Sequence, residues 1–180
     1  MAQIKQFVEE GGSVIAIGGV AMAYAQQFNI PVSNHLVENG QALSRDKFYA
    51  PGCVLELAVD ANNPLAHGVG SKVDVFFDNN PVFAMKTSAS AASAASAGQA
   101  PAATDAKAVA WFASPTPLRS GWAWGEKYFD KGIGMIESKV GKGHVFVFGP
   151  EILFRAQPHG TFKFFFNSLY LSSASDWPGK

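Results

Sequence analysis

A histidine and a glutamate three positions apart are the sharpest candidates for chemistry in this sequence. His35-Leu36-Val37-Glu38 has the His-x-x-Glu spacing that supplies two zinc ligands, and His159 follows at a distance that suits a third. A zinc hydrolase of this kind also needs a general-base glutamate well beyond the third ligand. The 21 residues after His159 contain no glutamate. We therefore interpret His35 as a loop histidine and keep a metallohydrolase built on His35, Glu38 and His159 as an alternative.

The one cysteine, Cys53, is a candidate nucleophile. A nucleophilic cysteine in an α/β hydrolytic fold lies on a sharp turn between a strand and a helix, flanked by glycine. Pro51-Gly52 precedes Cys53, but Val54-Leu55-Glu56-Leu57 continues as a strand. The sequence therefore predicts a buried thiol that packs as a small hydrophobic side chain.

Two glycine pairs could suggest phosphate binding. Gly18-Gly19 follows an apolar run, and Gly141-Lys142-Gly143 separates two others. Neither has the spacing of a dinucleotide-binding or P-loop motif. The second pair is explained by a hairpin turn.

Aromatic side chains offer a possible binding surface. Trp111, Trp122, Trp124 and Tyr128 could stack on a sugar or a peptide. Aromatic residues also fill cores and domain interfaces. The sequence leaves both interpretations open, so a glycan- or peptide-binding module is a second alternative.

Short apolar runs predict the elements that would position these residues. Strands are expected at 13–17, 53–59, 73–77, 82–85 and 108–113, with a hairpin of 135–140 and 144–148. The run 82–85 is expected to pair with 73–77. Apolar runs without polar alternation are typical of strands buried on both faces, as in parallel sheets. With helices at 2–10, 20–28 and 161–171, we predict an α/β fold, a three-layer and mainly parallel sheet with an antiparallel edge hairpin.

The last helix has an apolar stripe made of Phe162, Phe165, Phe166 and Leu169. Phe164 and Leu171 lie off this stripe. We therefore expect this helix to be covered on more than one side.

The composition indicates one globular domain. The chain has 180 residues, of which 48% are hydrophobic, and its 14 basic and 14 acidic residues cancel. It lacks a basic stripe interleaved with aromatic residues, which argues against a nucleic-acid partner. No apolar run reaches the roughly 20 residues of a membrane span. We expect one domain at 1–172 with a flexible Ala/Ser-rich insertion at 87–106, and a tail at 173–180.

Several segments resemble a known family. Residues 7–18, with their Gly-Gly turn and strand, and residues 140–149 are similar to parts of class I glutamine amidotransferase-like domains. Residues 48–52, 154–163 and 166–170 are similar to the amidotransferase-like C-terminal domain of bacterial zinc carboxypeptidase-family proteins. The resemblance covers most of 3–172 and implies a flavodoxin-like fold.

The sequence departs from this family where catalysis would take place. The nucleophilic cysteine is replaced in Ile17-Gly18-Gly19-Val20, and the catalytic histidine is missing from Gly149-Pro150-Glu151. Acyl transfer needs both groups. We therefore predict no catalytic residue in this chain, and Gly19, Gly149 and Glu151 as vestigial site positions.

The resemblance implies a non-catalytic accessory domain of a zinc carboxypeptidase-like hydrolase. The partner would be an upstream peptidase domain of the same polypeptide, which would hold the zinc, so we expect no metal or other cofactor in this chain. It also implies a periplasmic or secreted location. Domains of this type have strand–helix units before the helix at 2–10. We therefore expect an incomplete sheet with an exposed strand edge, which could lead to a homo-oligomer.

Overall fold

The computed structural model describes residues 1–86 and 105–174, and β-strands dominate this part of the chain. The strands are β1 (Ser13–Ile17), β2 (Val32–Asn34), β3 (Val37–Glu38), β4 (Gln41–Ala42), β5 (Cys53–Val59), β6 (Lys72–Phe77), β7 (Phe83–Met85), β8 (Lys107–Trp111), β9 (Leu118–Ser120), β10 (Ile133–Val140) and β11 (Gly143–Phe148). The α-helices of the described residues are α1 (Ala2–Glu9), α2 (Ala21–Gln27) and α4 (Phe162–Ser173), and short 3-10 helices are η1 (Gly18–Val20), η2 (Pro64–Ala66), η3 (Glu126–Phe129), η4 (Phe154–Ala156) and η5 (His159–Thr161).

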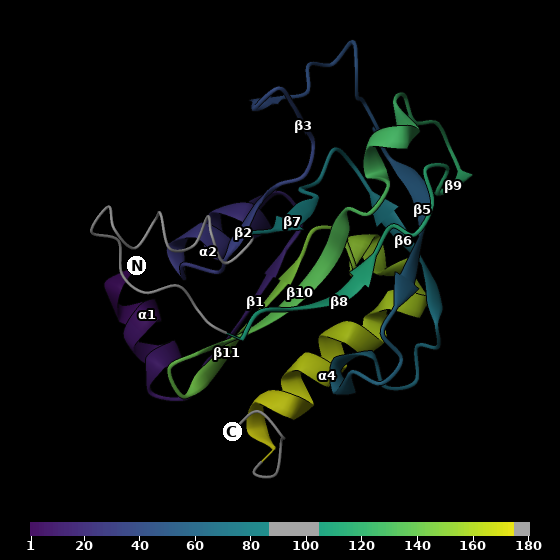
Figure 1. Cartoon of the computed structure of the whole chain (residues 1–180). Helices are drawn as coiled ribbons and strands as arrows, with labels where there is room; N and C mark the ends of the chain where they lie inside the picture. Colours follow the sequence, from purple (N-terminus) through teal and green to yellow (C-terminus); the bar gives the residue numbers. More distant parts are fainter. Residues whose placement is uncertain (87–104, 175–180) are drawn as a thin grey trace.

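Nine of the strands form one curved sheet (Figure 1). Its main order is β1-β11-β10-β8-β5-β6, with β7 joining β2 to β10 and with β9 beside β5. The strands β3 and β4 form a separate small ribbon. In the described part of the chain, β1 has only β11 as a neighbour, so its other edge is unpaired.

The prediction of an α/β, mainly parallel, three-layer sheet was wrong. Within residues 1–86 and 105–174, β1 with β11 is the one parallel pair, and the other pairs are antiparallel. The fold is mostly β, so the flavodoxin-like description fails as well. The apolar runs correctly indicated burial on both faces, since β11 is buried along its whole length. Burial on both faces does not determine strand direction, because two antiparallel strands can also have helices on each side.

Several individual elements agree with the sequence pattern. The strands at 13–17 and 53–59 are present, and residues 135–140 pair with 143–148 in the expected hairpin. The expected place of this hairpin at the edge of the sheet is wrong, because β1 and β8 flank it. The expected pairing of 82–85 with 73–77 is wrong, because β7 pairs with β2 and β10. Of the predicted insertion 87–106, residues 87–104 lie outside the described residues, as do residues 175–180 of the predicted tail.

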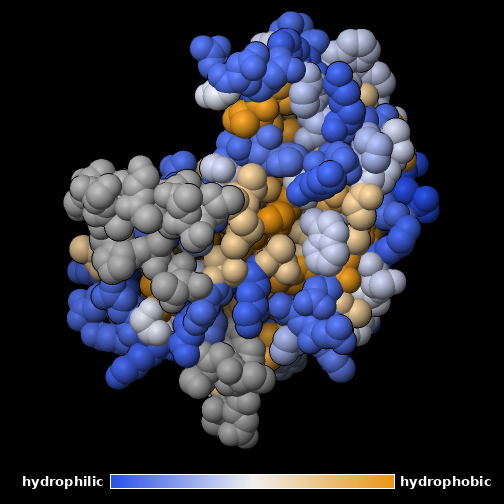
Figure 2. Space-filling view, viewed as in Figure 1, coloured by the Kyte–Doolittle hydropathy of each residue, from blue (hydrophilic) through white to orange (hydrophobic). Residues whose placement is uncertain are grey.

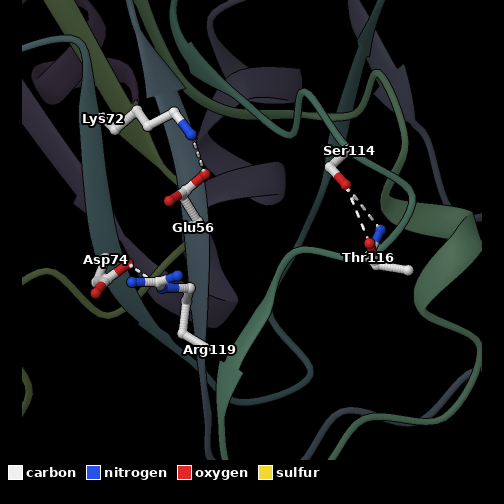
Figure 3. A network of polar contacts seen from close by, with 6 residues as sticks. All are labelled: Glu56, Lys72, Asp74, Ser114, Thr116 and Arg119. Atoms are coloured by element: carbon white, nitrogen blue, oxygen red, sulfur yellow. Dashed lines mark hydrogen bonds and ion pairs between the residues drawn. The ribbon is translucent and has the colours of Figure 1, made fainter.

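Strand β5 alternates in burial, which gives its sheet region an inner and an outer face. Its buried side chains are Cys53, Leu55, Leu57 and Val59. On the outer face, Glu56 accepts a hydrogen bond from Lys72 of β6 at 2.7 Å, and Asp74 lies 3.4 Å from Arg119 of β9 (Figure 3). The close-up also shows Ser114 and Thr116, whose hydroxyl oxygens are 3.2 Å apart in the segment before β9. Exposed pairs of this kind fix register and contribute little stability.

Helices cover the two faces of the β1–β11–β10 region. Val8 of α1 and Ala25 of α2 belong to one apolar cluster, and Phe164 of α4 belongs to the other. The predicted stripe on the last helix was wrong: Phe164 is fully buried, whereas Phe166 and Leu169 are 49% and 45% exposed. The sheet and the η2 segment cover the face that contains Phe164, and the outer face has no cover in the described structure.

Apolar side chains are also visible at the centre of the face shown in Figure 2, over β8 and β10 and between polar regions above and below. None of the helices among the described residues has the length and apolar character needed to cross a membrane.

Candidate functional site

The candidate ligands of the alternative metallohydrolase, His35, Glu38 and His159, do not form a metal site among residues 1–86 and 105–174. The His35 ring donates from Nε2 to the backbone oxygen of Asp130 at 3.0 Å. Glu38 accepts from the Tyr128 hydroxyl at 3.0 Å, and His159 lies in η5 before the last helix. Within residues 1–86 and 105–174, no three His, Cys, Asp or Glu side chains form a group that could hold a metal ion. The structure therefore does not bring His35, Glu38 and His159 together.

Glu38 instead ties two loops together. Lys47, and then Tyr128, donate hydrogen bonds to its carboxylate and hold the pKa of Glu38 below its ordinary value. The same contact raises the pKa of Lys47. Glu38 and Lys47 belong to the segment before β5, and Tyr128 belongs to η3. This network fixes the two segments that approach each other above the sheet.

Cys53 is buried, as the sequence predicted. Its side chain is 1% exposed in the main apolar cluster. Burial raises the pKa of the Cys53 thiol to about 11. Because the thiolate is the nucleophilic form, this thiol is chemically inert near neutral pH.

A carboxylate packs against the turn after β1, beside Gly18 and next to Gly19, where the resemblance placed a nucleophile. Gly18 has φ +71°, and any Cβ there would overlap the Glu151 carboxylate. The Asn80 amide donates to Glu151 Oε1 at 3.1 Å and holds it in place. Gly19 is exposed with open space around it, and a Cβ at Gly149 would overlap a backbone oxygen. Glu151 thus occupies the space that a side chain at position 18 would need.

The predicted aromatic set separates into three environments. Trp111 is half-buried in β8 and packs against the cluster that contains α2. Tyr128 is held by Glu38 and packs on the main cluster. Trp122 and Trp124 are 53% and 54% exposed. Trp122 and Trp124 are therefore the members of the set that remain available to a ligand.

Tyr49 joins these two tryptophans. The Tyr49 N–H donates to the Trp124 oxygen at 3.1 Å, and the Trp124 N–H donates to the Tyr49 oxygen at 2.8 Å. Residues paired in this way place their side chains on the same face. The rings of Tyr49 and Trp122 meet edge to face, with centroids 6.2 Å apart. Ala123 packs toward the core between the two tryptophans. We call Tyr49, Trp122 and Trp124 the aromatic platform.

Hydrogen bonds and backbone geometry hold the aromatic platform in position. The Trp124 indole donates from Nε1 to the Asp46 backbone oxygen at 2.7 Å. The Arg45 guanidinium lies 5.0 Å from the centre of the Tyr49 ring, within the range of a cation–π contact. Gly125 follows Trp124 at φ +78°, where a Cβ would overlap the Lys47 backbone oxygen. A larger residue at position 125 would therefore separate the two loops.

The platform combines two indole rings that are more than half exposed with polar groups at its edge. Large aromatic side chains usually bury most of their surface, so exposed and fixed rings indicate a contact surface. Arg45 supplies a cation, and hydrogen bonding from Ser44 holds the pKa of the Asp46 carboxyl below its ordinary value. This arrangement can stack on an apolar ring face and hydrogen-bond to the substituents around that ring.

The chain matches no protein-family model and no curated protein. Two solved structures are similar to it at low sequence identity. A β-galactosidase from Bacillus circulans sp. alkalophilus is 12% identical with a TM-score of 0.49, and the match covers 94% of this chain and 20% of that one. A ThuA-like protein from Bacteroides uniformis is 10% identical with a TM-score of 0.45, and the match covers 97% of this chain and 64% of that one. The chain thus spans less than two thirds of either protein.

Sequence reasoning missed Tyr49 and Arg45. Both lie more than 70 positions before Trp124, and their segment meets the tryptophan loop through a single isolated bridge. The motif at 48–52 had been noted for its family resemblance only. A pair of tryptophans two positions apart between Gly121 and Gly125 was the one available signal of two side chains on the same face.

Proposed function

We propose that this chain is a non-catalytic accessory domain that binds carbohydrate on the aromatic platform. The observation that carries this proposal is the fixed position of two indole rings, both more than half exposed and on the same face as Tyr49. The C–H face of a pyranose ring is apolar and flat, so it covers an indole without losing hydrogen bonds. The hydroxyl groups around that ring can reach Arg45 and Asp46.

A carbohydrate suits this surface better than an extended peptide does. A peptide that adds to a sheet needs free backbone donors and acceptors. At the platform, the N–H and oxygen of Tyr49 and of Trp124 bond to each other. What the platform offers a ligand is ring faces and charged side chains, which is the chemistry of sugar recognition.

Two positive observations support the absence of hydrolytic chemistry from this role. The position where the resemblance places a nucleophile is Gly19, which has no side chain, and the Glu151 carboxylate fills the space beside the preceding Gly18. The thiol of Cys53 is buried and has a raised pKa.

The accessory role is supported by a second exposed surface. Phe166, Leu169 and Tyr170 on the outer face of α4 are 49%, 45% and 72% exposed. A helix face of this kind suits packing against another protein domain. We propose the partner that the sequence resemblance implies, a zinc carboxypeptidase-type domain of the same polypeptide, to which this chain would present a carbohydrate-containing substrate.

Affinity electrophoresis and pull-down with cellulose, chitin and xylan test carbohydrate binding. We expect retention by at least one polysaccharide and up to about tenfold weaker binding after Trp122→Ala or Trp124→Ala, because a stacked ring contributes about 0.5 to 1.5 kcal/mol. Phe166→Ala is the matched control, since it removes an exposed ring outside the platform. Equal binding by the tryptophan variants, or no retention by any of the three polysaccharides, would contradict the proposal.

The accessory role has a separate test in the natural full-length polypeptide. Trp122→Ala with Trp124→Ala should slow hydrolysis of a polymeric substrate and leave hydrolysis of a small soluble peptide unchanged. An equal loss on both substrates would show that the tryptophans act on the catalytic domain itself.

A further inference from the structure

A second, polar site lies at the other end of the sheet. A cleft of about 520 Å³ is bounded by charged and amide side chains of β8, β10, β11 and the loop after β5. This volume is within the range of small-molecule sites. The residues that matter most for its chemistry are Asp60, Asn63, Asp105, Lys107, Glu137 and Lys139.

The strand register places side chains of both charges on one face. Glu137 of β10 is directly opposite Lys107 of β8. Lys139, two positions after Glu137, is opposite His144 of β11. Side chains at alternate positions of a strand share a face, so Lys107, Glu137 and Lys139 lie close together on the floor of the cleft.

Glu137 is a buried carboxyl with an unmet hydrogen-bonding requirement. It is 7% exposed, and burial raises its pKa above the ordinary value. The nearby Asn63 side chain and the Lys107 charge lower the pKa of Glu137 and oppose this rise. The Oε2 atom of Glu137 is buried and has no hydrogen-bond partner among residues 1–86 and 105–174. Glu137 is one of the residues that line the cleft, and buried polar atoms are almost always paired, so this oxygen indicates a missing donor at the position of Glu137.

We propose that this cleft binds a free α-amino acid, whose ammonium group pairs with Glu137 and whose carboxylate pairs with Lys107 and Lys139. An ammonium group offers three donors and a full charge, which makes the strongest hydrogen bond to a carboxylate. Asp60 and Asp105 add negative charge on the walls. This site is independent of the aromatic platform, and either can exist without the other.

A zwitterion fits the cleft better than a simple ion does. A cation alone would meet Lys107 and Lys139, and an anion alone would meet Asp60, Asp105 and Glu137. An α-amino acid has both of its charged groups attached to one carbon atom, which matches the opposite charges of Glu137 and Lys107 on adjacent strands.

Titration of the ¹⁵N-labelled chain followed by NMR tests this proposal with matched probes. L-Serine and L-glutamine are the zwitterions, L-serinamide lacks the carboxylate, N-acetyl-L-serine lacks the ammonium group, and D-glucose is a neutral polyhydroxyl compound. We expect saturable shifts at Lys107, Glu137 and Ser138 with at least one zwitterion, and about tenfold weaker binding of both serine derivatives. No shifts with either amino acid, or equal binding of L-serinamide or D-glucose, would overturn the proposal.

Two variants assign the roles. Glu137→Gln should weaken L-serine binding about tenfold, and Lys107→Met should weaken L-serine without weakening L-serinamide. Glu56→Gln is the control, because it removes an exposed strand carboxylate outside the cleft. If Glu137→Gln does not fold, Lys107→Met still tests the pairing by itself. Lys107 is exposed, so its replacement should leave the fold intact. If Lys107→Met weakened the binding of L-serine and of L-serinamide equally, Lys107 would not pair with the ligand carboxylate.

Discussion

The aromatic platform exposes side chains that are usually buried, whereas the cleft lined by Glu137 buries a side chain that is usually exposed. At the platform, Trp122 and Trp124 keep apolar rings in water. At the cleft, Glu137 keeps a carboxyl group out of water, and one of its oxygens has no partner in the described part of the chain. Each arrangement costs free energy in the isolated chain, and each cost falls when a ligand of the right chemistry binds. The comparison shows that candidate sites can be recognised by what they leave unsatisfied as well as by reactive groups.

The largest effect is expected where burial follows the ordinary rule. Phe164→Ala removes a fully buried ring of α4 and should lower the free energy of unfolding by about 3 to 5 kcal/mol. Phe166→Ala, two positions on, removes a ring that is 49% exposed and should cost less than about 1 kcal/mol. Denaturant unfolding of both variants measures the difference. If both variants lost a similar free energy of unfolding, the outer face of α4 would be packed against another surface in solution. Phe166 could then not serve as an example of an exposed ring.

The next largest effect is expected when both tryptophans of the aromatic platform are replaced. Trp122→Ala with Trp124→Ala should weaken polysaccharide binding up to about a hundredfold while the free energy of unfolding changes by less than about 1 kcal/mol. Affinity electrophoresis and denaturant unfolding give the two values. Trp111→Phe is the control, because Trp111 lies away from the platform and packs on a core cluster. If Trp111→Phe weakened binding equally, the platform would be wrongly defined.

A smaller effect, opposite in sign, is expected at Glu137. Burial raises its pKa above 4.5 in the folded chain, so its destabilising effect is absent below about pH 4.5 and grows as pH rises through the folded value. Glu137→Gln should therefore raise the free energy of unfolding at pH 7 by about 1 kcal/mol. The gain should disappear in acid.

Unfolding measured at pH 4 and pH 7 checks this prediction. Glu56→Gln provides the contrast, because the hydrogen bond from Lys72 lowers the pKa of Glu56. That replacement should bring no gain at pH 7. A stabilising effect of Glu137→Gln that is equal at both pH values would show that the effect comes from packing and not from charge burial.

The smallest effect on stability is expected on the outer face of α4. Phe166→Ser with Leu169→Ser changes exposed side chains and should leave the free energy of unfolding almost unchanged. We expect the unmodified chain to self-associate weakly through this face and the double variant to be monomeric. Sedimentation velocity at several concentrations measures this. A monomeric unmodified chain would show that this face requires a different partner.

Local chemistry was predictable from the sequence. The apolar run at 53–59 predicted a strand with Cys53 buried, and both are present. Glycine between two β-rich runs predicted the β10–β11 hairpin. These predictions depend on the hydrophobicity and turn preference of a few neighbouring residues, which can be read from the sequence without knowledge of the fold.

Strand direction, helix orientation and the partners of each site were decided by the tertiary structure. The apolar runs predicted strands at 53–59 and 108–113 but not that β5 and β8 pair antiparallel in a mostly β sheet. The last helix is apolar on several sides, so its stripe could not indicate that Phe164 would face the core and Phe166 the solvent. Tyr49 meets Trp124, and Lys107 meets Glu137, only through pairing between distant segments. Such contacts depend on the packing of the whole sheet, because no local preference of either segment favours one distant partner over another.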